Sequence, residues 1–371
     1  MKKIRILMVL KSTALAGAES FVMNVIRSID KDKFNIDVAV SDDTRGGYAD
    51  EMKALGCVIH LLPEYRVTNV IDYKKKWTEF FEKNNYDVVH GNLSNSAFLY
   101  LDIAKKFGAN TIVHSHSGGF RGSFLQRILK RFTSKLAKSP ADYWFACSDN
   151  AAYSHYGTAY KNYDKFYLIP NGIIARNYRF DKSLRDKVRM QYDLTDDILV
   201  VGHVGSFTPP KNHIFLIEIF KEILSLHPST KLMLIGDGNL RKAIHEKANN
   251  LGINESIIFT GSVSNVNEYM MAMDIMVFPS IFEGLPVSLV ESQAAGLRWV
   301  ASDTITKEVC LSDIASYKSL NDSASSWAEE VLKHTNIENR AYYNDIVCQT
   351  DFNMALSIKK LEKIYEESIS K

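Results

Sequence analysis

The segment 279–291, which reads PSIFEGLPVSLVE, has the features of a site for an anionic ligand. It follows a short apolar run at 275–278, and Pro286 suits the first turn of a helix that starts here. The backbone N–H groups of Gly284 and Leu285 would then lie at the mouth of that helix, where free donors and the helix dipole attract an anion. The segment therefore predicts an anion site at a helix N-terminus.

Two glutamates of this segment, Glu283 and Glu291, are eight residues apart. Eight helical residues turn about 80° past the starting direction, so the two carboxylates are not expected to form a general acid/base pair on one helix face. We expect them to contact different parts of one elongated ligand, because carboxylates accept hydrogen bonds from sugar hydroxyls and a buried carboxylate without a partner is unstable. The coincidence of loop, glycine, proline and helix disfavours the alternative of two ordinary surface residues.

The loop 205–213, which reads GSFTPPKNH, follows another apolar run at 198–204. Lys211 stands just before a helical pattern, and a compact ammonium group beside a helix N-terminus suits a diphosphate. The loop lacks the GxxxxGK[ST] pattern of a P-loop. Considered alone, Lys211 is more simply interpreted as a solvated residue at a helix start.

Two shorter loops also contain glycine. Gly236 and Gly238 would let the backbone approach a planar ligand closely. The sequence ALAGAE at 14–19 opens a helical pattern whose N–H groups could contact a phosphate, but it is not the GxGxxG fingerprint of dinucleotide-binding proteins. Taken alone, each loop is better explained as a tight turn.

Short apolar runs alternate with amphipathic stretches along the whole chain, which is typical of parallel sheets covered by helices on both faces. The expected strands are 4–10, 35–40, 58–62, 87–90, 111–114 and 143–147, then 198–204, 232–235, 257–260, 275–278 and 299–302. The expected helices include 18–29, 73–83, 97–107, 214–226, 240–251, 287–295 and 353–370. The pattern predicts an α/β fold with two doubly wound, Rossmann-like domains in series.

The expected domains join near the IPNG sequence at 169–172, and a polar stretch at 176–197 precedes the second sheet. We predict an N-terminal domain at 1–172 and a C-terminal domain at 173–352. Ligands of open α/β sheets bind beyond the carboxyl ends of the strands, so two such domains facing each other would form a binding cleft. No strand pattern follows the helix at 353–371, so this helix must pack on an existing surface.

Composition excludes several functional classes. The chain has 371 residues, of which 46% are hydrophobic and 24% charged, and its net charge of +2 argues against a dedicated nucleic-acid binder. The four cysteines lack metal-site spacing, which favours buried thiols in a reducing compartment. No apolar run approaches the ~18 residues that span a bilayer, and the N-terminal run 4–10 fits a buried strand better than a signal peptide. We therefore expect a cytoplasmic protein.

The segment 124–138 combines an apolar stripe with five basic residues and no acidic one. A basic amphipathic helix of this kind can lie on an anionic lipid surface, which would make the protein peripheral on the inner face of the cell membrane. A domain helix with a solvated basic face is the equally favoured alternative.

Taken together, these motifs resemble those of retaining glycosyltransferases of the GT-B fold, in the family 4 (group 1) class. The segment from Glu283 to Glu291 is similar to the E-x7-E signature of that family, and its other motifs resemble AGAE at 16–19, IPNGI at 169–173, the loop 205–213, GDG at 236–238 and FPS at 278–280. The segment 302–309 is similar to one in bacterial exopolysaccharide and capsule transferases. The resemblance covers most of the chain.

The resemblance implies transfer of a sugar from a nucleotide-diphosphate donor to a glycan or polyprenyl-linked acceptor, with no resident cofactor and no metal. It implies that the acceptor belongs to the N-terminal domain, on which the C-terminal helix packs back. The catalytic residues it implies are Glu283 at the donor sugar, His116 near the reacting carbon and Lys211 at the diphosphate, with His90 and His114 as weaker candidates. The donor-binding residues it implies are Gly17, Gly205, Ser206, Gly238, Val263, Gly284, Leu285, Val287 and Glu291, the last at the ribose hydroxyls.

Two positions depart from the family pattern. Ser206 stands where the family usually has an arginine, and the loss of a guanidinium near a diphosphate weakens binding by ~1.5–3 kcal/mol unless another group replaces it. Arg241 is a conceivable replacement, and reduced activity is the other expectation. Arg298 stands where a proline is usual, in a helix-to-strand connection where we expect little effect on catalysis.

Three other functions remain as alternatives. A non-hydrolysing sugar-nucleotide epimerase would form product from the donor alone. A non-catalytic subunit that binds a sugar nucleotide would fit the serine at position 206. A nicotinamide-dependent oxidoreductase is disfavoured because the GxGxxG fingerprint is missing.

Overall fold

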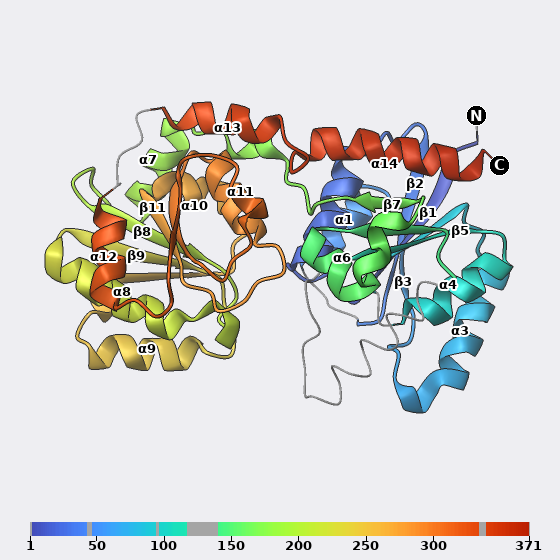
Figure 1. Cartoon of the computed structure of the whole chain (residues 1–371), viewed down its shortest axis with the longest axis horizontal. Helices are drawn as coiled ribbons and strands as arrows, with labels where there is room; N and C mark the ends of the chain where they lie inside the picture. The colour runs from blue at the N-terminus through green and yellow to red at the C-terminus, as the bar shows by residue number, and fades with distance from the viewer. Residues whose placement is uncertain (1, 43–46, 94–95, 117–139, 334–338, 371) are drawn as a thin grey trace. The chain divides into compact units, whose positions relative to one another are not determined.

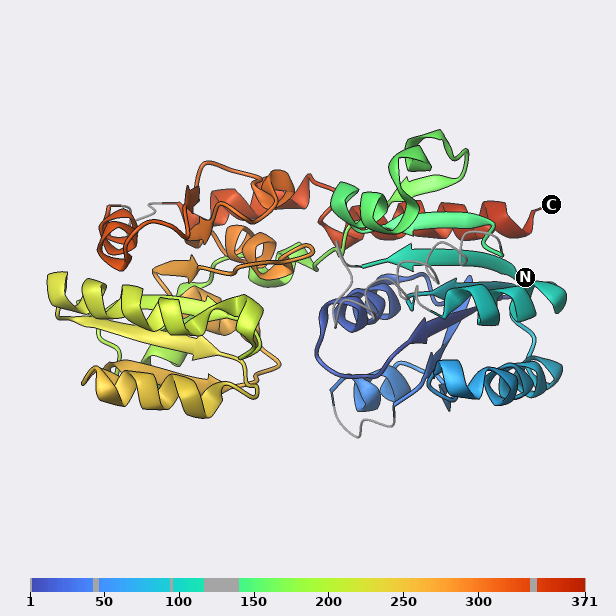
Figure 2. The ribbon, with the colours of Figure 1, turned by 60° about the horizontal axis from the view of Figure 1, so that its bottom comes forward.

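The computed structural model describes residues 2–42, 47–93, 96–116, 140–333 and 339–370. The chain divides into two compact units, the first formed by Met1–Ile173 together with Asp351–Lys371 and the second by Ile174–Thr350. Each unit contains one parallel sheet with helices on both of its faces (Figures 1 and 2). The predicted α/β fold class is confirmed in both units.

The first unit is built on a parallel sheet with the strand order β3-β2-β1-β4-β5-β6-β7. Its strands are β1 (Ile4–Leu10), β2 (Phe34–Val40), β3 (Ile59–Leu61), β4 (Val88–Gly91), β5 (Asn110–Ser115), β6 (Tyr143–Ala146) and β7 (Phe166–Leu168). Its α-helices in the described ranges are α1 (Gly17–Ser28), α2 (Ala49–Ala54), α3 (Val70–Lys83), α4 (Ala97–Lys106), α6 (Asp149–Tyr156) and α14 (Met354–Ile369). Helix α14, from the far end of the chain, packs beside α1 (Figure 1).

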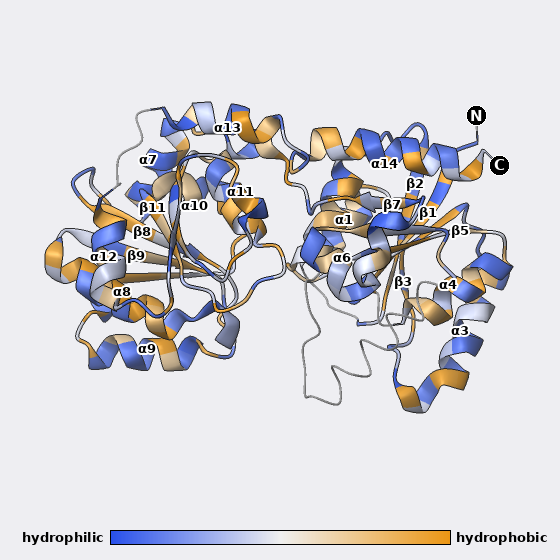
Figure 3. Ribbon diagram, viewed as in Figure 1, coloured by the Kyte–Doolittle hydropathy of each residue, from blue (hydrophilic) through white to orange (hydrophobic). Residues whose placement is uncertain are grey.

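The second unit repeats the topology, with the strand order β10-β9-β8-β11-β12-β13. Its strands are β8 (Leu199–Val204), β9 (Thr230–Ile235), β10 (Ile257–Gly261), β11 (Ile275–Phe278), β12 (Arg298–Ser302) and β13 (Ala315–Lys318). Its α-helices in the described ranges are α7 (Lys182–Gln191), α8 (His213–Leu226), α9 (Arg241–Asn250), α10 (Val266–Ala272), α11 (Val287–Ala294), α12 (Ala324–Leu332) and α13 (Arg340–Cys348). The central strands are largely hydrophobic, as expected for strands covered on both faces (Figure 3).

No element was predicted in the polar stretch 176–197, but the structure has helix α7 there. Strands β7 and β13 were not among the expected strands either. The inward face of α7 carries arginines where apolar residues are usual. Arg185 and Arg189 donate hydrogen bonds to the backbone carbonyl of Ala272 and pair with the Asp274 carboxylate at 2.7 and 3.3 Å. Hydrophobic periodicity cannot reveal a helix that is held by buried guanidinium groups.

Candidate active site

The second unit has its topological switch point between β8 and β11, because the chain leaves these neighbouring strands toward opposite sides of the sheet. Ligands of doubly wound sheets bind in the crevice beyond the carboxyl ends of two such strands. Lys211 lies in the connection after β8, and Glu283 lies in the connection after β11. The sheet topology therefore brings these two predicted residues to one place.

Lys211 and Glu283 form an ion pair, with 2.8 Å between Nζ and Oε1 and side-chain exposures of only 16% and 11%. The ammonium group also lies 4.7 Å from the centre of the Phe278 ring, at a distance that allows a cation–π interaction. A Cβ atom on Gly205 would lie 3.0 Å from Lys211 Cε, so the glycine leaves room for the lysine to pass. The result is a partly shielded cation at the switch point, with a carboxylate beside it.

The two loops that carry this pair are bonded to each other. Asn212 adopts the left-handed conformation with φ 57°, which asparagine tolerates better than most residues, and its Nδ2 donates to the Pro279 carbonyl at 3.1 Å. The Ile281 N–H donates to the Pro210 carbonyl at 2.8 Å. These bonds fix the lysine loop against the glutamate loop.

Glu291 lies inside α11 and accepts a hydrogen bond of 2.7 Å from the hydroxyl of Tyr178. Burial raises the pKa of Glu291 above its usual value, while the bond from Tyr178 and the positive charge of Lys211 partly oppose that rise. Glu291 therefore faces the same site as Lys211. Tyr178 was not predicted, because no motif marks its position at the end of the short 3-10 helix Ala175–Tyr178, which precedes α7.

The start of α11 lies close to where the sequence placed it. Pro286 occupies the N-cap position and Val287 is the first helical residue. Leu285 is buried and Gly284 is half-buried, so both lie in the turn that leads from Glu283 into the helix. The dipole of α11 therefore favours an anion at the end that carries Gly284 and Leu285.

Glycines shape the connection after β9, which neighbours β8. A Cβ atom would lie 2.2 Å from the Gly205 carbonyl oxygen at Gly236 and 2.6 Å from the Phe207 carbonyl oxygen at Gly238, so neither position accepts a side chain without movement. Val263 is half-buried in the loop after β10, the next strand along the sheet. Gly238 and Val263 thus lie along the same sheet edge as Lys211.

The two departures from the family pattern lie at opposite edges of this sheet. Ser206 is exposed after β8, and its hydroxyl lies 3.4 Å from that of Thr208. Arg241 begins α9 in the neighbouring connection and pairs with Asp237 at 3.0 Å. Arg298 is the first residue of β12 and therefore lies at the amino edge of the sheet, away from Lys211.

The remaining predicted residues, Gly17 and His116, lie in the first unit. Gly17 is the first residue of α1, after β1, and a Cβ atom there would be 4.0 Å from Asn171 Nδ2. His116 follows β5, and its Nδ1 and Nε2 atoms each lie 2.7 Å from a side-chain amide group, those of Asn171 and Asn92. Burial lowers the pKa of His116 to about 4, so its ring is neutral at pH 7. A neutral ring donates from one nitrogen and accepts at the other, so one asparagine accepts with its amide oxygen and the other donates with its NH2 group. Asn92, which follows β4, was missed by sequence reasoning.

His90 and His114 are held in a hydrogen-bonded chain behind His116. The Ile169 carbonyl, 3.2 Å from His114 Nε2, can only accept, so Nε2 carries the proton and His114 Nδ1 must accept from His90 Nε2. His90 Nδ1 then accepts from the Tyr365 hydroxyl at 2.7 Å. Burial lowers the pKa of His90 to about 3 and that of His114 well below its usual range. Both rings are thus neutral and fixed, and they support the site from within the unit.

Two family models match the chain in succession. The model described as Glycosyltransferase Family 4 matches residues 15–176, and the one described as Glycosyl transferases group 1 matches residues 198–336. The chain belongs to this glycosyltransferase family. The glycosyltransferase is 27% identical to EpsF of Bacillus subtilis (strain 168) over 99% of this chain and 97% of that protein. EpsF is itself named only provisionally as a glycosyltransferase. It is 24% identical to the capsular polysaccharide glycosyltransferase CapH of Staphylococcus aureus over 94% of this chain and 95% of that one.

A further relative is the Escherichia coli enzyme UDP-Gal:alpha-D-GlcNAc-diphosphoundecaprenol alpha-1,3-galactosyltransferase, with 24% identity over 78% of each chain. Among solved structures, Anabaena Alr3699/HepE in complex with UDP-glucose matches with a TM-score of 0.81 and 18% identity over 98% of this chain and 100% of that one. The predicted GT-B fold is confirmed by this likeness.

The predicted membrane segment 124–138 lies outside the described residues. Within the ranges that the structure describes, no helix is both long enough and apolar enough to cross a membrane.

Proposed function

We propose that this glycosyltransferase is a retaining, metal-independent hexosyltransferase of bacterial surface polysaccharide synthesis. Its donor is a nucleotide-diphosphate sugar and its acceptor a glycan or polyprenyl-linked sugar. Support comes from CapH, named for capsular polysaccharide biosynthesis, and from the E. coli relative, whose name gives a UDP-sugar donor and a diphosphoundecaprenol acceptor.

The observation that carries the proposal is the Lys211–Glu283 pair at the switch point, with Glu291 beside it. A donor would lie along the carboxyl edge of the sheet, its base near Gly238 and Val263 and its diphosphate at Lys211 and the start of α11. This orientation is supported by the sheet order β10-β9-β8-β11, because Val263, Gly238, Lys211 and the start of α11 follow these four strands in turn. A diphosphate that binds Lys211 competes with Glu283 for the ammonium group. The Glu283 carboxylate can then accept hydrogen bonds from the donor sugar.

The bond that breaks joins the anomeric carbon of the donor sugar to the diphosphate oxygen, and the bond that forms joins that carbon to an acceptor hydroxyl oxygen. The hydroxyl proton passes to the departing diphosphate, whose growing negative charge Lys211 and the N–H groups of Gly284 and Leu285 stabilise. Attack from the same face as the leaving group retains the anomeric configuration. Arg241, one connection away from Ser206, supplies the guanidinium that the serine lacks.

A thermal-shift panel of UDP-, GDP- and dTDP-sugars tests the donor class, with a CMP-sugar, which carries only one phosphate, as the negative control. A ligand at 100 times its dissociation constant adds ~2.7 kcal/mol to stability, which corresponds to roughly 5–10 °C for a unit of this size. We expect one nucleotide class to give this shift in the wild type and the Glu283→Gln variant to keep most of it while losing sugar transfer to an acceptor extract. Product with an inverted anomeric centre would contradict retention.

The exposed Ser206 favours a second candidate, a subunit that binds the sugar nucleotide without transferring the sugar. The two functions differ in one result. A binding subunit with Glu283→Gln restores polysaccharide production in a deletion strain, whereas a transferase with that change does not.

A further inference from the structure

We propose that Tyr178 is a positioning residue that holds the Glu291 carboxylate for the ribose of the donor, and that this contact selects ribonucleotide donors over 2′-deoxyribonucleotide donors. The inference rests on the proposed function and narrows its donor to a ribonucleoside diphosphate sugar. The contact itself is the 2.7 Å hydrogen bond that the Tyr178 hydroxyl donates to Oε1 of Glu291. The two residues are 113 positions apart in the chain, so the bond depends on the fold of the second unit.

The short helix that carries Tyr178 is bonded to the helix that carries Glu291. Asn344 of α13 is buried, and its Nδ2 donates to the Ala175 carbonyl at 2.6 Å and to the Ala294 carbonyl at 2.8 Å. Ala175 is the first residue of the 3-10 helix that ends at Tyr178, and Ala294 is the last residue of α11. Because this bridge fixes the two backbones, the tyrosine hydroxyl reaches Glu291 from a rigid base.

One oxygen of Glu291 remains for a ligand. Tyr178 occupies Oε1, and within the described ranges no other hydrogen-bond donor contacts the carboxylate. The Glu291 side chain is half-buried, so part of it stays accessible. Burial raises its pKa because the carboxylate has lost part of its water shell, and ligand hydroxyls can replace the lost hydrogen bonds.

Tyr178 also gives the two carboxylates of the site different partners. Lys211 pairs with Glu283 at 2.8 Å, and its positive charge also opposes the rise in the pKa of Glu291. Without the Tyr178 hydroxyl, Glu291 would be drawn toward the same ammonium group, which the diphosphate needs. The tyrosine therefore reserves Glu291 for the neutral hydroxyls next to the diphosphate, which are those of the ribose.

The sugar of the nucleotide decides how well this carboxylate is satisfied. A ribose offers two neighbouring hydroxyls, at C2′ and C3′, whereas a 2′-deoxyribose offers one. A site built to bond a hydroxyl rejects an analogue that lacks it, because a polar group of the protein is left unpaired. The preference requires a fixed carboxylate, since a mobile one turns to water instead. Tyr178 thus favours UDP- or GDP-sugars and disfavours dTDP-sugars, which contain deoxyribose.

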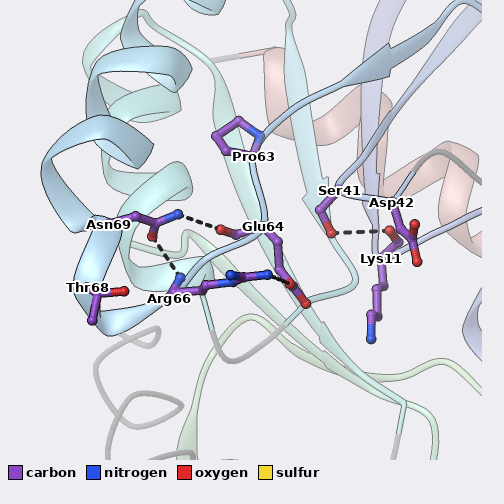
Figure 4. Close-up of a pocket in the computed structure, with 8 residues that line it drawn as sticks. All are labelled: Lys11, Ser41, Asp42, Pro63, Glu64, Arg66, Thr68 and Asn69. Atoms are coloured by element: carbon purple, nitrogen blue, oxygen red, sulfur yellow. Dashed lines mark hydrogen bonds and ion pairs between the residues drawn. The ribbon is translucent and has the colours of Figure 1, made fainter.

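The first unit also contains a cavity of a size that suits small molecules, at the carboxyl ends of β1, β2 and β3 (Figure 4). It has a volume of about 640 Å³ and is lined by Lys11, Ser41, Asp42, Pro63, Glu64, Arg66, Thr68 and Asn69. The carboxylates of Asp42 and Glu64 repel a diphosphate there. Arg66→Met is therefore a control for nucleotide that binds outside the second unit.

Isothermal titration calorimetry with the full chain tests the proposal, with UDP, GDP and their 2′-deoxy forms as the ligands. We expect the wild type to bind one ribonucleotide roughly tenfold more tightly than its 2′-deoxy form, as for one charge-assisted hydrogen bond. In Tyr178→Phe, the ribonucleotide should bind roughly tenfold more weakly and the 2′-deoxy form within about threefold of the wild type, so that most of the preference is lost.

Tyr192→Phe is the matched control. Tyr192 is also half-buried, its hydroxyl lies 3.4 Å from that of Tyr269, and it precedes β8 at the amino edge of the sheet. This variant and Arg66→Met should keep the dissociation constants of the wild type for both forms of the nucleotide.

A merely structural role of Tyr178 predicts that Tyr178→Phe weakens both forms equally and keeps the wild-type preference, which would overturn the proposal. Equal affinity of the wild type for the two forms would overturn it without any variant. Both outcomes leave the proposed function standing, because a nucleotide still binds. Weaker binding by Arg66→Met would place the nucleotide in the first unit and contradict the proposal. Binding of neither UDP nor GDP to the wild type would instead reject the proposed function, and this inference with it.

Discussion

At the scale of single residues, Lys211 and Glu283 stabilise each other as an ion pair when no ligand is bound. Lys211→Met leaves the shielded Glu283 carboxylate without its counter-ion, so we expect a loss of about 1–3 kcal/mol in the free energy of unfolding. The double variant Lys211→Met/Glu283→Gln should recover most of this loss, and both variants should lose the nucleotide-sugar thermal shift. Urea denaturation measures the free energy of unfolding of the wild type, of Lys211→Met and of the double variant.

Lys221→Met is the matched control for that series, since Lys221 is exposed on α8. It should change neither the stability nor the thermal shift. If the double variant is no more stable than Lys211→Met, the ion pair does not explain the effect.

Glu291 should show a conflict between stability and binding. Its pKa is raised from the usual 4.5 in the folded protein, so its contribution to stability is complete below pH 4.5 and is lost as the pH rises through the folded pKa. Glutamine has no charge to bury, and we expect Glu291→Gln to unfold at a temperature a few degrees higher than the wild type at pH 8 and at the same temperature at pH 4. Donor affinity should fall, because the amide is a weaker acceptor for ribose hydroxyls.

Scanning calorimetry at the two pH values checks this expectation, with the exposed Glu246→Gln as the control. A lower unfolding temperature at pH 8 would show that the Glu291 carboxylate stabilises the protein on its own.

Sequence reasoning reached residues that sit in recognisable motifs and missed their partners. Lys211 and Glu283 were found because glycine, proline and charge coincide at strand ends, and the structure pairs them. Tyr178 and Asn92 act through contacts with Glu291 and His116, residues more than 20 positions away in the chain. Such contacts depend on tertiary packing, which no local pattern encodes.

At the scale of elements, the last helix of the chain, α14, completes the first unit. Tyr365 of α14 donates to His90 of β4 inside the unit, and the backbone of Ile173 exchanges hydrogen bonds with Phe352 and Met354. We expect Tyr365→Phe to lower the free energy of unfolding by about 1–3 kcal/mol, because it leaves a buried imidazole nitrogen unsatisfied. Tyr342→Phe, at an exposed position on α13, is the control.

Urea titrations of the two variants would measure this difference. Equal stability of Tyr365→Phe and the wild type would show that the bond to His90 adds nothing to the docking of α14.

The amphipathic pattern of α14 could be recognised in the sequence, whereas that of α7 was hidden by its inward arginines.

At the scale of the whole molecule, both units bury neutral histidines. Besides His90, His114 and His116 in the first unit, burial lowers the pKa of His213 to about 4 and holds that of His203 well below its usual range in the second. The unfolded chain binds protons at these sites below its ordinary histidine pKa of 6.5, whereas the folded chain does not. Stability is therefore complete above pH 6.5 and is lost as the pH falls toward 4.

We expect the free energy of unfolding, measured by urea titration, to fall between pH 7.5 and pH 5.5 by about 1 kcal/mol per buried histidine. Most carboxylates stay ionised over this range, so the histidines dominate the change. A flat profile would mean that the buried rings accept protons in the folded state.

The discontinuous first unit also affects how the protein is made. A ribosome that has finished residue 173 must synthesise the 177 residues 174–350 before it reaches residue 351, where the missing part of the unit begins. At roughly 5–20 residues per second this delay lasts about 9–35 s. The nascent first unit spends that time without α14. The surface around His90 that α14 covers in the finished protein is therefore open to a chaperone until translation ends.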